Sequence, residues 1–179
     1  MSMLSKLALP SVLVSCATCV AAGQFSSGNW SAAKIGNTCY VYTQRAQSHT
    51  SGTLIFGFTK GGYNATFQYE YTPWHGETEA PWSESDAVVL EVDGAEIWLG
   101  EEMFPRFWTG NYSAELTTGF VSEMLMTVST TQSNIAVAFD QSATGEIVLF
   151  GNFSPIGFRE SLARAAQWCE FEPTALPGS

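Results

Sequence analysis

The chain has 179 residues, 45% of them hydrophobic, and its 17 acidic and seven basic residues give a formal net charge of −10. This length is typical of one domain that buries a sizeable core without extra cross-links. The negative charge disfavours nucleic acid and anionic lipid surfaces as partners, because phosphate binding requires clustered lysine and arginine. No cofactor is expected.

Residues 1–22 have the pattern of an export signal. Lys6 precedes an apolar run over 7–14, and small residues follow as far as Gly23. The run is much shorter than the roughly 20 apolar residues of a membrane span. Two cleavage sites stay open: an ordinary signal peptidase site before Gly23, and a lipobox over 13–16 in which Cys16 would be lipidated. We expect a periplasmic or secreted protein whose sole membrane attachment would be a lipid at Cys16.

Cleavage before Gly23 leaves two cysteines, Cys39 and Cys169. In an oxidising compartment these two would form one disulfide, which closes a loop of about 130 residues. The alternative is a catalytic thiol, which needs a nearby histidine as its base. Because His49 and His75 both lie in polar, turn-rich segments, the sequence favours the disulfide.

Most of the remaining chain has the alternation and the β-branched and aromatic content of strands. Asp93-Gly94 suits a two-residue hairpin turn with positive φ. A helix is predicted over 119–128, and a clearer one over 155–169, with Ser154 as its cap. The predicted strands cover 37–43, 52–59, 65–71, 86–92, 95–99, 134–140 and 146–153.

These elements predict one mostly-β, β-sandwich-like domain over 23–169, with one or two short helices, the clearest at the C-terminus. The proline-rich residues 170–179 are predicted to be a disordered tail.

Two segments rich in aromatic residues, 72–85 and 101–111, interrupt the strand pattern. They contain Trp74, Trp82 and Trp108, which could bind a small ligand or glycan, because loops with large aromatic side chains often form recognition surfaces. The alternative is that these rings fold back and cover the open ends of a sandwich core.

Carboxylates gather at Glu77, Glu79, Glu84 and Asp86. Two of them could act as an acid–base pair on glycosides, or the loop could bind Ca²⁺ through its oxygen atoms. The EF-hand spacing is absent, and His75 with Glu77 and Glu79 is the sole combination suited to zinc. Neither a phosphate-binding loop nor a Gly-x-Ser-x-Gly motif occurs. We assign no catalytic residue and no metal ligand, and metal binding by residues 77–86 stays open.

Four motifs follow one another along the chain: an early Trp30, the cysteine-bearing strand 38–43, the segment 153–162 with its Gly-Phe pair, and the terminal Cys169. This order resembles that of the invasion-associated locus B family of small exported alphaproteobacterial proteins. The resemblance implies a periplasmic β-sandwich-like domain with no established catalytic activity, linked by name to host-cell invasion or colonisation. It supplies no catalytic residues.

The leading interpretation is a non-enzymatic exported protein of the periplasm or envelope, whose partner is an envelope or host protein. The alternative is a small ligand- or glycan-binding module that uses its aromatic loops.

Overall fold

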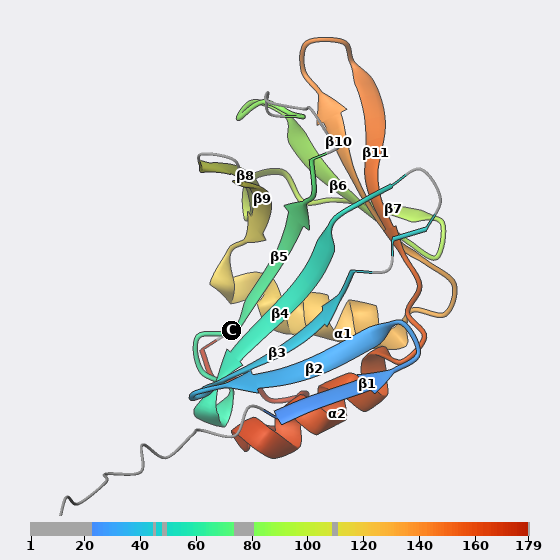
Figure 1. The fold of residues 1–179 in the computed structure, drawn as a ribbon. Helices are drawn as coiled ribbons and strands as arrows, with labels where there is room; N and C mark the ends of the chain where they lie inside the picture. The colour runs from blue at the N-terminus through green and yellow to red at the C-terminus, as the bar shows by residue number, and fades with distance from the viewer. Residues whose placement is uncertain (1–22, 45, 48–49, 74–80, 109–110, 179) are drawn as a thin grey trace, which may run out of the picture.

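The fold is that of a computed structural model, which describes residues 23–178 except 45, 48–49, 74–80 and 109–110 (Figure 1). This part of the chain forms two antiparallel sheets and two α-helices, so the prediction of a mostly-β fold is confirmed. The helices are α1 (Val121–Thr130) and α2 (Phe158–Cys169). The strands are β1 (Gly23–Ser27), β2 (Trp30–Ile35), β3 (Thr38–Thr43), β4 (Thr53–Thr59), β5 (Thr66–Tyr71), β6 (Ala87–Val92), β7 (Ala95–Trp98), β8 (Met103–Trp108), β9 (Asn111–Leu116), β10 (Ile135–Gln141) and β11 (Glu146–Phe153).

The larger sheet has seven strands in the order β1-β2-β3-β4-β5-β9-β8. Its first five strands follow one another along the chain as antiparallel neighbours, so short turns suffice to connect most of them. In β5, Phe67, Tyr69 and Tyr71 are buried and Gln68 and Glu70 are partly exposed. This is the period-two alternation that the sequence shows, and it turns one face of the sheet toward the core.

The smaller sheet has four strands in the order β11-β10-β6-β7. Asp93 and Gly94 join β6 to β7 with φ angles of 53° and 82°, so the predicted two-residue turn is confirmed. The predicted hairpin of β10 and β11 also forms, with a register shift between Val137 and Ala138.

Side chains from both sheets and both helices form one hydrophobic cluster. Trp30 is fully buried in it, where its indole Nε1 donates a hydrogen bond to the Ser154 carbonyl oxygen at 2.8 Å. Its ring meets that of Phe158 edge to face, with 4.7 Å between centroids. Because the rings of Trp30 and Phe158 are both buried and in contact, β2 and the start of α2 pack together in the core.

Helix α2 packs against β1, β2 and β3 (Figure 1). Lys34 of β2 donates from Nζ to the Trp168 carbonyl oxygen at 2.8 Å, which places a cation at the negative end of the helix dipole. The helix begins three residues later than predicted, because Gly157, with φ of 94°, takes the position before its first turn. Ser154 does not cap it, and its Oγ instead accepts a hydrogen bond from the Ile156 amide.

Several parts of the chain differ from the sequence-based prediction. Strands β1, β2 and β9 were not predicted, and the segment 101–111, predicted as a loop, contains β8. The described residues 170–178 of the predicted disordered tail lie against the body: the Phe171 ring stacks on Phe58 at 4.5 Å, and Leu176 is buried. These apolar side chains follow α2 directly and cover the end of the core. Among the described residues, no helix is long and apolar enough to cross a membrane.

Candidate functional site

The outer face of the seven-stranded sheet carries a row of partly exposed side chains, most of them polar or aromatic. Paired residues of neighbouring antiparallel strands point to the same face, so the register places Phe104 of β8 beside Glu115 of β9. Glu115 pairs in turn with Gln68 of β5. The row continues through Ile55 of β4 to Tyr42 of β3. All five side chains are partly exposed, which leaves this face open to a binding partner.

A groove of 380 Å³ opens where this row crosses β5, β9 and β8. The Nε of Arg106 lies 2.6 Å from a carboxylate oxygen of Glu115, and its guanidinium lies 5.0 Å from the centre of the Phe104 ring. Gln68 and the hydroxyl-bearing Thr117 also line the groove. Donors, acceptors and an aromatic ring side by side suit a polar ligand that also has an apolar face, such as a sugar.

The groove depends on residues that the sequence analysis interpreted only in part. Phe104 and Arg106 lie in the segment 101–111, which was recognised as unusual but predicted as a loop. Glu115 was missed. Tyr112, Ala114 and Leu116 are buried at every second position of β9, and that alternation is the signal from which the strand could have been predicted.

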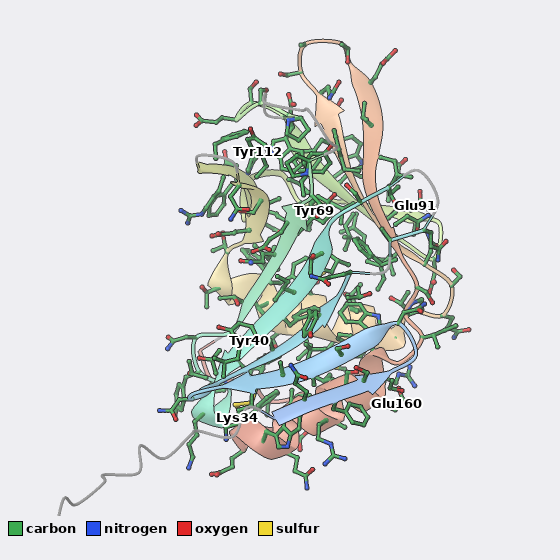
Figure 2. The ribbon with its side chains drawn as sticks, in the orientation of Figure 1. Lys34, Tyr40, Tyr69, Glu91, Tyr112 and Glu160 are labelled. Atoms are coloured by element: carbon green, nitrogen blue, oxygen red, sulfur yellow. A yellow bond between two sulfur atoms is a disulfide. The ribbon has the colours of Figure 1, made fainter. Side chains whose placement is uncertain are left out.

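Trp82, a predicted ligand-binding residue, belongs to the core. It is 4% exposed, and its ring stacks on Phe139 of β10 at 4.1 Å. On its other sides it meets Tyr69 and Tyr71 of β5, so it lies between the two sheets. Figure 2 labels Tyr69 on β5. Trp82 therefore fits the alternative interpretation, in which the ring covers the sandwich core. The prediction that Trp82 binds a ligand at the surface is wrong, because its ring is buried.

The other predicted binding residues lie outside the described part of the chain. Trp74 and Cys16 fall in undescribed segments, as do His75, Glu77 and Glu79, and of Trp108 only the backbone is described. Among the described residues, no group of three or more His, Cys, Asp or Glu side chains is arranged to hold a metal ion.

Asp86, one of the predicted acidic candidates, is a buried structural carboxylate. Its Oδ1 accepts hydrogen bonds from the hydroxyls of Ser83 and Ser142 at 2.8 and 2.9 Å. The Ser142 amide also donates to Oδ1, and the Ser83 amide donates to Oδ2. Burial by itself raises the pKa of Asp86, but these hydrogen bonds outweigh it and hold the pKa below its ordinary value. The side chain therefore joins the segment before β6 to the β10–β11 turn. The neighbouring Glu84 is exposed.

Asp93, in the β6–β7 turn, has a similar role at the other end of the smaller sheet. Its carboxylate accepts hydrogen bonds from the hydroxyl and amide of Ser133, both at 2.7 Å, and from the Gln132 amide at 3.0 Å. These bonds, the Ser133 hydroxyl first, lower the pKa of Asp93 to about 2. The carboxylate fixes the loop between α1 and β10.

The structure contains the predicted disulfide between Cys39 of β3 and Cys169, the last residue of α2. Both residues are almost fully buried, and their Cα atoms are 6.1 Å apart. The disulfide covalently links helix α2 to strand β3 of the larger sheet.

The chain matches no known family model, and no curated protein matches it. Its fold is similar to the crystal structure of invasion associated protein B from Bartonella henselae, with a TM-score of 0.53 and 15% identical residues. The similarity covers 80% of this chain and 96% of that one. At this identity it shows a shared fold, and that is the fold which the family resemblance implies.

Proposed function

We propose that this chain is a non-enzymatic protein of the bacterial periplasm or envelope that acts by binding another component. The observation that carries the proposal is the buried Cys39–Cys169 disulfide within a fold shared with invasion associated protein B. Structural disulfides persist in oxidising compartments outside the cytoplasm. The name of invasion associated protein B supports an envelope or host protein as the partner, in invasion or colonisation.

The mass of the intact protein from its native host tests export. A chain that begins at Gly23 and gains about two daltons on reduction would support a soluble exported form with one disulfide. A heavier chain with acyl groups on Cys16 would support the lipid-anchored form. An uncleaved chain with free thiols would overturn the proposal.

The non-enzymatic part of the proposal has a separate test. Purified protein is incubated with peptidoglycan, envelope glycans and envelope peptides, and the products are analysed by mass spectrometry. We expect no turnover. Turnover that one point substitution abolishes, without a change in melting temperature, would show that the protein is an enzyme.

A second candidate function is a small ligand- or glycan-binding module, and the groove beside Phe104 and Arg106 favours it. Tryptophan fluorescence against a panel of sugars and peptides would detect binding, and Arg106→Gln should weaken it. Arg164→Gln is a matched control, because Arg164 also lies over a ring, that of Phe25 at 5.1 Å, but belongs to α2 and does not line the groove. No response to any compound, or equal effects of both substitutions, would reject this candidate.

A further inference from the structure

The negative charge of the protein is concentrated in one stretch of the chain. Residues 84–146 contain eleven of the 17 acidic residues and only one of the seven basic residues, Arg106. The rest of the chain has six acidic and six basic residues, so the whole net charge of −10 comes from 84–146. This stretch includes β6, β7 and β10 of the smaller sheet, β8 and β9 of the larger sheet, and helix α1. Figure 2 shows Glu91 on this part of the molecule and Lys34 at the end formed by β2 and α2.

Within this acidic part lies a small apolar pocket, where β7, β9 and α1 meet. Its volume is 140 Å³, and its lining includes the nearly buried Leu99, Leu116 and Met124. The ring of Phe120, which is 38% exposed, forms part of its rim. For comparison, an apolar protein cavity of about 150 Å³ holds one benzene molecule. The pocket therefore accommodates the apolar part of one side chain.

Two carboxylates from different elements also line this pocket. Glu102 belongs to the 3₁₀ helix η2 (Gly100–Glu102), and Glu123 lies in the first turn of α1. Neither forms a salt bridge within the part of the chain that the structure describes. None of the residues that line the pocket is basic. The pocket thus combines an apolar floor with two negative charges that have no opposite charge from the described residues.

We infer that this pocket binds a lysine or arginine side chain from a basic segment of a partner protein. Such a side chain has an apolar stem, which fits the floor, and a cationic head, which would lie between Glu102 and Glu123. The surrounding negative field attracts basic partners over a distance and raises the rate of association. A second copy is a poorer occupant, because it would bring another net charge of −10 against the same acidic surface. This inference rests on the proposed function, since it names the chemistry of the partner.

The probe is an acetylated, amidated five-residue peptide that alternates arginine and leucine, titrated into ¹⁵N-labelled protein and followed by amide chemical shifts. The control peptide replaces each arginine by citrulline, which keeps the shape and removes the charge. We expect shifts at Leu99, Glu123 and Met124, tighter binding of the arginine peptide, and loss of that advantage as salt rises from about 0.01 M to about 1 M.

Three variants separate charge from shape. Glu102→Gln with Glu123→Gln removes both charges, and each removal should weaken binding by up to about fivefold. Glu101→Gln is the matched control, because it removes a charge from the same 3₁₀ helix at a residue that does not line the pocket. Thr127→Met fills the pocket from α1 without changing the charge and should abolish binding. Melting temperatures show that each variant is folded.

Equal binding of the arginine and citrulline peptides, or equal effects of the pocket and control variants, would overturn the inference. Sedimentation that shows a dimer which Thr127→Met dissociates would assign the pocket to a second copy and would also overturn it. Neither result changes the mass expected for the exported protein. The inference can therefore be rejected while the proposed function stands, and the reverse also holds.

Discussion

Removal of the disulfide is the sharpest test of how this fold is stabilised. We consider the variant in which Cys39 and Cys169 are both replaced by alanine. Because the two residues are 130 positions apart, the cross-link constrains almost the whole described chain in the unfolded state. On the chain-entropy model a loop of this length contributes about 5 kcal/mol to the free energy of unfolding. Single domains have about 5–15 kcal/mol in total, so the loss is a large fraction of the stability.

The folded state should survive this change. Helix α2 remains attached through the buried Phe158, Leu162 and Ala165, and alanine fits where the buried sulfur atoms were. We therefore expect a native fold whose melting temperature is lower by about 10–20 °C, from about 2–4 °C for each kcal/mol in a domain of this size.

Urea unfolding of the oxidised protein, the reduced protein and the double variant measures the effect. The reduced protein and the variant should have similar midpoints, and reductant should not affect the variant. Leu162→Ala is a control, because it removes packing of the same helix and should cost about 2–5 kcal/mol in the oxidised and reduced forms alike. A double variant within about 1 kcal/mol of the oxidised protein would refute the argument.

Three further predictions concern single residues. Trp82→Ala should lower the free energy of unfolding by about 3–5 kcal/mol, because it leaves a cavity between the sheets. Urea unfolding measures this loss, and a value under about 1 kcal/mol would contradict the place of Trp82 in the core. Asp93→Asn should be less stable than the parent protein at pH 7, since the folded pKa of Asp93 is lowered to about 2. A carboxyl group whose pKa is lowered by folding stabilises the protein above its unfolded pKa, and this stabilisation is lost as the pH falls through the folded pKa. The urea midpoints of the parent protein and of Asp93→Asn should therefore converge between about pH 4 and pH 2. A difference between the two midpoints that stays constant over this range would exclude the linkage. Gly157→Ala should cost more than about 2 kcal/mol, because φ is 94° and a Cβ would lie 1.8 Å from a backbone oxygen of β1. Gly36→Ala is the control, because Gly36 has φ of 60° and an added Cβ would meet no atom within 4 Å, so it should cost about 1 kcal/mol. Equal melting temperatures of the two variants would contradict the close approach of Gly157 to the β1 backbone.

Local chemistry in the sequence was sufficient to predict much of the fold. The alternation of Phe67, Tyr69 and Tyr71 predicts a strand with one buried face, and Asp93-Gly94 predicts its hairpin turn, since both signals depend on neighbouring residues alone. The cysteine pairing followed from the predicted export signal, because its cleavage before Gly23 would leave one possible partner for each thiol. The mostly-β class and the two helices were predicted in the same way.

The candidate sites were decided by tertiary structure. Trp82 and Phe104 both lie in unusual aromatic segments, yet one is buried between the sheets and the other lines a surface groove. Glu115 gains its partner Arg106 because β9 pairs with β8, and Glu102 of η2 and Glu123 of α1 line one pocket although they are distant in the chain. Periodicity and turn chemistry act over a few residues, whereas a site forms from strands and helices that are distant in the chain. The sequence by itself therefore determined most of the elements and their buried faces, and only the packing of the two sheets decided which side chains meet.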